Sequence, residues 1–241
     1  MTDSLADARN ALARATRIAV LTGAGISAES GIPTFRDAMT GLWARFRPED
    51  LATPEAFVAN PKHVWDWYAW RREFVANAVP NAGHVALVEI EKRAAHFALV
   101  TQNVDGLHAR AGSRNVIELH GNIMQDRCFA EGRMLAREEQ LPGTPPLCAR
   151  CGAFVRPGVV WFGEALPEHA LREAYAEART CDLFLSIGTS GLVEPAASLP
   201  FIARDAGARV IEVNPVRTPL SSRATIVLQG AAGEVLPQLL A

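Results

Sequence analysis

The residues best suited to chemistry lie in one stretch near the N-terminus, residues 22–37, which reads TGAGISAESGIPTFRD. An apolar run ends at Leu21, and Gly23 and Gly25 follow it at once. A strand that leads through glycines into a helix N-terminus is a common pyrophosphate site, because glycines let the backbone approach closely and the helix end supplies free N–H donors. The next glycine, Gly31, comes six residues after Gly25, whereas dehydrogenases use G-x-G-x-x-G. The stretch therefore predicts a dinucleotide site without ordinary hydride transfer.

Polar or small residues follow the other apolar runs of the chain closely. They are Gln102, Asn103 and Asp105 after residues 97–101, His120 after residues 116–119, Gly188, Thr189 and Ser190 after residues 183–187, Asn214 after residues 210–213, and Ala232 after residues 225–228. An open α/β sheet binds its ligand at the carboxyl ends of its strands, so we expect these residues to meet at one cleft. Each motif alone is more often an ordinary turn. His120 is the candidate general base, because an imidazole with a pKa of about 6.5 suits that task near neutral pH.

Short apolar runs alternate with helix-like segments along most of the chain. The runs, which contain mostly Val, Ile, Leu and Phe, are residues 18–21, 97–101, 116–119, 183–187, 210–213 and 225–228. Residues 4–16, 167–180 and 196–206 have helical character. Runs that are apolar on both faces are typical of parallel strands covered by helices. The sequence therefore predicts an α/β fold with a doubly wound, Rossmann-like parallel sheet.

Two long stretches interrupt this alternation. Residues 38–83 carry many aromatic side chains and look helical, with Pro54 and Pro61 as breakers, whereas residues 125–159 contain cysteines and prolines and show little periodicity. We expect the two inserts to form a smaller lobe, the first helical and the second made of loops and a ribbon. The large lobe would then comprise residues 1–37, 84–124 and 160–241 of a single catalytic unit.

Composition excludes several classes of function. Lys and Arg total 24 against 26 Asp and Glu, for a formal net charge of -2, so no nucleic-acid partner is indicated. No stretch approaches the ~18 apolar residues of a membrane span, and Arg9, Arg14 and Arg17 interrupt any apolar signal sequence. Four cysteines in a chain of 241 residues favour a reducing compartment over a disulfide framework. We therefore expect a cytoplasmic protein without membrane or nucleic-acid partners.

Six blocks of sequence occur in order: GAGIS with GIPTFR, TQNVDGLH, ELHG, VVWFGE at residues 159–164, GTS, and GEVLP at residues 233–237. Together they resemble the sirtuins, a family of NAD-dependent protein lysine deacylases, from about residue 17 to the C-terminus. Such an ordered set is highly specific. The resemblance implies an enzyme that consumes NAD as a co-substrate and acts on acylated lysines of proteins. We expect it to be a monomer.

The resemblance assigns roles to the residues already singled out. The NAD-binding positions that it implies are Gly23, Ala24, Gly25, Phe35, Arg36, Gln102, Asn103, Asp105, Gly188, Thr189, Ser190, Asn214 and Ala232. Asn103 and Asp105 would hold the nicotinamide ribose and carboxamide so that nicotinamide departs. His120 would act as general base on a ribose hydroxyl after the acyl oxygen has attacked the anomeric carbon. The implied products are nicotinamide, free lysine and O-acyl-ADP-ribose, with Asn103 and His120 as the catalytic residues.

The same resemblance implies how the acylated lysine is bound. The peptide would pair by strand addition with Val159, Trp161, Phe162, Gly163 and Glu164. Tyr68 and Arg71 stand at i and i+3 on one helix face, a spacing that by itself more often gives an exposed arginine beside a core tyrosine. With the small residue Ala52, they look like the sirtuin branch that removes succinyl and malonyl groups, because a guanidinium and a phenol suit a carboxylate. We expect desuccinylase and demalonylase activity, with deacetylation weaker or comparable.

The cysteines depart from the sirtuin pattern, in which two C-x-x-C pairs hold a structural zinc. Cys148 and Cys151 form an intact pair, but residues 128–131 read CFAE, with Glu131 in place of the partner of Cys128. Three outcomes stay open: zinc held by three thiolates with Glu131 or water as fourth ligand, a weak and often empty site, or no zinc. Residues 125–159 are thus expected to be zinc-ribbon-like, with Cys128, Cys148 and Cys151 as candidate ligands.

Other functions compete with this hypothesis. A nicotinamide oxidoreductase would need the tighter glycine spacing and an acidic residue about 20 positions on, after a second strand, and no apolar run precedes residues 40–50. A mono-ADP-ribosyltransferase shares the loss of nicotinamide, but label from NAD would then stay on protein. A plain deacetylase without preference for acidic acyl groups is a further alternative. A non-catalytic reader of acylated lysine would lack the base that His120 supplies.

Overall fold

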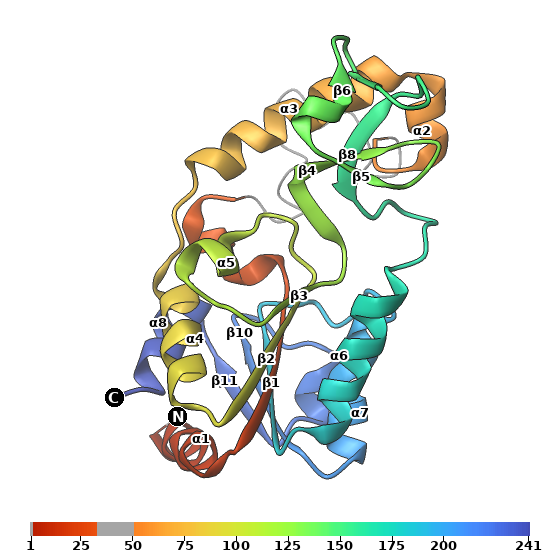
Figure 1. Ribbon diagram of the computed structural model, residues 1–241. Helices are drawn as coiled ribbons and strands as arrows, with labels where there is room; N and C mark the ends of the chain where they lie inside the picture. The colour runs from red at the N-terminus through yellow and green to blue at the C-terminus, as the bar shows by residue number, and fades with distance from the viewer. Residues whose placement is uncertain (1, 33–50) are drawn as a thin grey trace.

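The computed structural model describes residues 2–32 and 51–241 (Figure 1). Six parallel strands of these residues form the central sheet, in the order β11-β10-β9-β1-β2-β3. Their bounds are β1 Arg17–Thr22, β2 His96–Thr101, β3 Val116–Glu118, β9 Leu183–Ile187, β10 Arg209–Asn214 and β11 Ile226–Gln229. Each predicted apolar run forms one of these strands, so the predicted α/β fold with a doubly wound parallel sheet is confirmed.

Helices cover both faces of this sheet (Figure 1). On one face lie α1 Thr2–Arg14, α4 Ala82–Arg93 and α8 Ala232–Gln238, and on the other lie α6 Glu168–Thr180 and α7 Leu199–Asp205. Successive side chains of β1 alternate between two cores, since Val20 clusters with Leu87 of α4 and Leu21 clusters with Ala178 of α6. Burial on both faces explains why this strand reads as a continuous apolar run. Among the described residues, no helix combines the length and the apolar character needed to cross a bilayer.

A smaller group of elements lies at the upper end of the molecule in Figure 1. It contains α2 Pro54–Ala59, α3 Pro61–Asn77, the antiparallel sheet β5-β4-β8, with β4 Gly121–Cys128, β5 Met134–Leu135 and β8 Val155–Val159, and the short pair β6 Gln140–Leu141 and β7 Leu147–Cys148. Pro54 and Pro61 occupy the first turns of α2 and α3, where the missing N–H has no intrahelical partner to lose. They therefore begin these helices rather than break one. The residue ranges of the two lobes stay a prediction.

The segment after β1 differs from the sequence prediction. Two 3-10 helices follow the strand, η1 Ala24–Ile26 and η2 Ala28–Ser30, and no α-helix begins between Gly23 and Ile32. The N–H of Gly25 donates to the carbonyl of Gly188 at 2.8 Å, so this amide is directed to the loop after β9. The prediction of an α-helix N-terminus at this point was wrong. The remaining short helices of the described residues are α5 Leu107–Ala111, η6 Arg137–Glu139, η7 Ala196–Ser198 and η8 Pro219–Ser222.

Candidate active site

The loops that follow β1 and β9 cross at contact distance. A Cβ on Gly25 would lie 2.8 Å from the Cα of Gly188, and a Cβ on Gly188 would lie 2.5 Å from the N of Ile26. Gly188 also has a φ of 60°, which other residues adopt at a cost. Gly23 is similarly close, because its Cβ would lie 2.9 Å from the side chain of Thr189. The glycines thus let two strand ends meet, a packing reason that the sequence did not reveal.

Asn103, Asp105 and Ser27 form one buried hydrogen-bonded cluster beside this crossing. The side-chain amide of Asn103 donates to the Gly23 carbonyl and to Ser27 Oγ, each at 3.1 Å. Ser27 Oγ in turn donates to one carboxylate oxygen of Asp105 at 2.7 Å, and the other oxygen accepts from the N–H of Leu107 at 2.9 Å. The cluster fixes both predicted side chains in place. Sequence reasoning missed Ser27, although its position within GAGIS was the signal available.

His120 follows β3 and lies half-buried at the same edge of the sheet. Its Nδ1 lies 2.8 Å from the carbonyl oxygen of Gln102. Because a carbonyl only accepts, Nδ1 carries the proton and Nε2 keeps a free lone pair. Burial lowers the pKa of His120, and the bond to Gln102 opposes this effect only in part. The imidazole is therefore neutral near pH 7, in the tautomer that a general base needs.

Several other residues predicted to bind NAD also converge. Gln102 donates from its side chain to Thr189 Oγ1 at 2.9 Å, and Asn214 donates to the carbonyl of Thr189 at 2.7 Å. Ser190 is half-buried beside them, and Ala232 is buried where α8 begins. The structure thus brings the ends of β2, β9 and β10 together at Thr189. The two remaining predicted positions, Phe35 and Arg36, lie outside the described residues.

The segment from Val159 to Glu164 leads from β8 to the surface next to His120. The N–H of Val160 donates to the His120 carbonyl at 2.9 Å, and the N–H of Phe162 donates to the Ala52 carbonyl at 2.9 Å. Phe162 is exposed, and Gly163 has a φ of 83°. The segment therefore touches both the candidate base and one of the residues predicted for the acyl pocket.

Tyr68 of α3 lies in the core shared by α3 and this segment, and Arg71 of the same helix is half-buried. Burial raises the pKa of Tyr68 to about 12, so its hydroxyl stays protonated. Burial also lowers the pKa of Arg71, while the nearby Tyr68 and Asp105 favour its charged form. The Nη1 of Arg71 is buried and has no hydrogen-bond partner among the described residues. Arg71 is thus not the exposed arginine that its spacing alone favoured.

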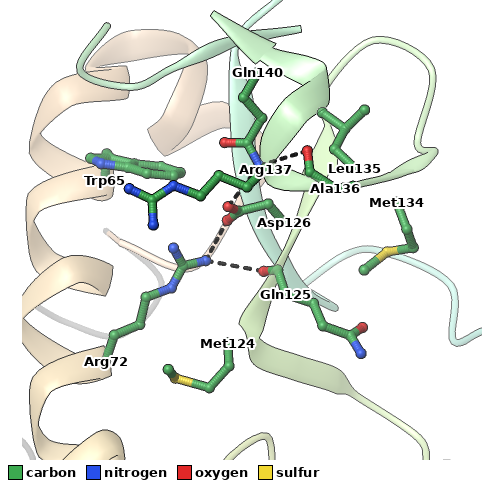
Figure 2. A pocket seen from close by; sticks show the side chains of 10 residues that line it. All are labelled: Trp65, Arg72, Met124, Gln125, Asp126, Met134, Leu135, Ala136, Arg137 and Gln140. Carbon is green, nitrogen blue, oxygen red and sulfur yellow. Dashed lines mark hydrogen bonds and ion pairs between the residues drawn. The ribbon is translucent and has the colours of Figure 1, made fainter. Parts of the chain in front are cut away.

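The neighbouring Arg72 provides a contrast, because its guanidinium bonds to three groups of β4. It donates to the carbonyls of Ile123 and Gln125, at 2.6 and 3.0 Å, and pairs with Asp126 at 2.6 Å. Arg72, Gln125 and Asp126 line a cavity of about 790 Å³ between α3 and the sheet of β4 and β5, shown in Figure 2. None of the predicted site residues lines this cavity. Arg72 therefore ties α3 to β4, whereas Arg71 is left available.

Comparison with protein-family models identifies the family of this chain. The model of the Sir2 family matches residues 23–195, more than half of the chain, and includes the glycine crossing, Asn103, Asp105 and His120. The chain belongs to the Sir2 family. The resemblance to sirtuins that the motifs predicted is confirmed.

Relatives of this sirtuin are similar over nearly their whole length. An NAD-dependent protein deacylase of Aquifex aeolicus is 58% identical over 205 residues, which are 85% of this chain and 85% of that protein. An NAD-dependent protein deacylase of Ralstonia nicotianae is 54% identical over 236 residues, 98% of this chain and 96% of the relative. The crystal structure of a Sir2 homologue in complex with NAD has a TM-score of 0.90 at 49% identity, and covers 98% of this chain and 92% of that one.

The cysteine cluster of this sirtuin has a carboxylate as its fourth member. Cys128, Glu131, Cys148 and Cys151 place one potential ligand atom each within 4.8 Å of one another. The thiol sulfurs of Cys128 and Cys151 lie 3.4 Å apart. Tetrahedral zinc with thiolates at about 2.3 Å needs ligand atoms ~3.8 Å apart, so the donor set and its spacing fit this metal. The Glu131 carboxylate also faces Arg150, whose Nε lies 3.4 Å away.

Proposed function

We propose that this sirtuin uses NAD to remove acidic acyl groups, above all succinyl and malonyl, from lysines of protein substrates. One NAD and one water are consumed for each acyl group removed, and the products are nicotinamide, free lysine and O-acyl-ADP-ribose. One observation carries the acyl preference: a buried guanidinium nitrogen of Arg71 without a hydrogen-bond partner among the described residues, on the same helix as the protonated hydroxyl of Tyr68.

Different residues of the cleft bind the two ends of NAD, act as the base and bind the substrate peptide. Asn103 and Asp105, held by Ser27, orient the nicotinamide end of NAD, and the residues around Thr189 and Asn214 hold the adenosine end. NAD supplies the leaving nicotinamide and the ADP-ribose that accepts the acyl group. The free Nε2 of His120 takes a proton from a ribose hydroxyl, and Nδ1 stays fixed on the Gln102 carbonyl. The segment from Val159 to Glu164 pairs with the backbone of the substrate peptide.

The acyl pocket is selective because the Arg71 guanidinium has a buried nitrogen that lacks a hydrogen-bond acceptor among the described residues. A carboxylate at the end of a succinyl group would accept hydrogen bonds from Arg71 and Tyr68, which are charge-assisted and therefore strong. An acetyl group leaves the buried guanidinium without that partner. Ala52, a small and buried residue, leaves room for the longer acyl chain.

A panel of four peptides tests this proposal. The same peptide is prepared with acetyl-, malonyl-, succinyl- or glutaryl-lysine, and kcat/KM is measured at saturating NAD with mass analysis of the products. We expect kcat/KM for succinyl and malonyl to exceed that for acetyl about tenfold or more, since a hydrogen bond to a charged group contributes roughly 1.5–3 kcal/mol. Equal or greater rates on acetyl-lysine would contradict the acyl preference. ADP-ribose left on protein instead of O-acyl-ADP-ribose would contradict deacylation itself.

The cofactor proposal concerns the cysteine cluster. Cys128, Cys148, Cys151 and Glu131 would hold one structural zinc ion, with the carboxylate as the fourth ligand. Protein purified without chelator should contain about one zinc per chain, and chelation should lower its Tm because metal binding contributes to folding. A Glu131→Cys variant should retain zinc at higher chelator concentrations. Less than about 0.1 zinc per chain, or a Tm that chelation leaves unchanged, would contradict the proposal.

A further inference from the structure

Among the described residues, the hydroxyl of Tyr68 has one hydrogen-bond partner. The indole Nε1 of Trp161 lies 2.9 Å from the Tyr68 oxygen, and both side chains are buried. An indole N–H only donates, so the Tyr68 oxygen is the acceptor in this bond. The proton of the phenol is therefore not used on Trp161 and remains free to be donated elsewhere. The direction of this bond decides what Tyr68 offers to a ligand.

The indole of Trp161 is held from two sides. The guanidinium of Arg156, itself buried, lies over the ring with its Cζ 3.3 Å from the ring centre. The ring of Phe57 packs against the indole with centroids 5.3 Å apart. A cation over an indole face is an attractive contact that strengthens when water is excluded. The plane of Trp161, and with it the direction of its N–H, is fixed before any ligand arrives.

Glu164 completes this arrangement by anchoring Arg156. Its carboxylate accepts two bonds from the guanidinium, at 2.5 and 2.9 Å, and one from the backbone N–H of Trp161 at 2.8 Å. Burial alone would raise the pKa of Glu164, but the bonds from Arg156 and from Trp161 outweigh it, and the pKa lies below its usual range. The carboxylate is therefore ionised and forms a charge-assisted pair with Arg156. Glu164 holds the backbone of Trp161, and Arg156 holds its indole ring.

We propose that Trp161 is a positioning residue for acyl selectivity. Its indole N–H occupies a lone pair of the Tyr68 oxygen, and this leaves the Tyr68 O–H to donate to the carboxylate of the bound acyl group beside Arg71. Arg156 and Glu164 act one step further away, by fixing the indole. This inference rests on the proposed preference for acidic acyl groups, and it is separate from the backbone pairing expected of the segment from Val159 to Glu164.

A kinetic cycle tests the inference through the ratio of kcat/KM for succinyl-lysine to that for acetyl-lysine. Trp161→Phe retains a ring but removes the N–H, and should lower this ratio about three- to tenfold, the usual size of one net hydrogen bond. The loss should appear mainly in KM for the succinyl peptide. Tyr68→Phe should lower the ratio as well. In the double variant, Trp161→Phe should add no further loss, because it acts through the Tyr68 hydroxyl.

Trp65→Phe is the matched control, because Trp65 lines the cavity of Figure 2 outside the site and should leave the ratio unchanged. A second readout needs no substrate. In a proton NMR spectrum, the resonance of the Trp161 indole N–H can be assigned because it disappears in Trp161→Phe. It should shift upfield in Tyr68→Phe, because the N–H then lacks its hydrogen-bond acceptor.

The outcomes separate this inference from the function on which it rests. Wild-type protein without any preference for the succinyl peptide would overturn the proposed function and this inference together. A wild-type preference that Trp161→Phe retains, additive losses in the double variant, or an indole resonance that Tyr68→Phe leaves in place would overturn this inference alone.

Discussion

Replacing His120 with alanine is expected to lower kcat/KM for every acylated peptide by about two to four orders of magnitude, the usual contribution of a general base. The side chain is held with its proton on Nδ1, which donates to the Gln102 carbonyl, so only Nε2 faces the reaction as a base. No other histidine of the described residues stands at the end of a strand beside Asn103. The measurement is steady-state deacylation with saturating NAD, on protein whose Tm matches that of the wild type.

The control for this variant is His169→Ala, since the side chain of His169 is 91% exposed and lies on α6. It should retain full activity. The wild-type pH profile gives a second check. Because burial lowers the pKa of His120, the neutral base persists below pH ~6.5, and kcat/KM should decline only as pH falls further. A His120→Ala variant with more than a tenth of wild-type activity, or an acid limb above pH ~6.5, would contradict the role of His120.

Arg71→Met is expected to lower kcat/KM for the succinyl peptide by roughly thirtyfold or more, because a buried carboxylate that loses its charged partner costs about 2 kcal/mol or more. Deacetylation should fall far less, since acetyl-lysine makes no bond to the guanidinium. Methionine retains much of the length of the arginine side chain but carries no charge. The two rates are measured on the same peptide sequence, so that any general damage to the site cancels in their ratio.

Arg72→Met is the matched control on the adjacent residue. Arg72 makes its bonds to Ile123, Gln125 and Asp126, so its loss should lower the Tm but leave the ratio of succinyl to acetyl activity unchanged. If Arg71→Met reduces both activities equally, Arg71 does not read the acyl carboxylate. The same holds if Arg72→Met changes the ratio as much as Arg71→Met does.

Much of the fold followed from local sequence. The strand β1 is apolar on both faces, with Val20 and Leu21 in opposite cores, and such a run can be recognised without neighbours. The order of the strands could not be predicted, because it depends on which runs pair. The 3-10 helices after β1 were also missed. Their backbone is held by a bond between Gly25 and Gly188, residues that are distant in the chain.

The candidate site divides in the same way. Asn103, Asp105 and His120 could be predicted because they follow strands whose carboxyl ends share one edge. Ser27 lies within the GAGIS motif, but its bond to Asp105 becomes visible only when the two loops are placed. The burial of Arg71 and the contact between Tyr68 and Trp161 likewise depend on tertiary packing, since 93 residues separate the latter pair. Spacing on a helix predicts which face two residues share, but not what covers that face.

The measurement that tests the account most directly is a crystal structure of the protein with a succinyl-lysine peptide bound. The account predicts that the succinyl carboxylate lies within about 3.2 Å of both the Arg71 guanidinium and the Tyr68 hydroxyl, which are hydrogen-bond distances. It also predicts that the Trp161 indole still donates to Tyr68. A well-defined carboxylate that points to solvent, or that binds elsewhere while Arg71 stays unpartnered, would contradict it.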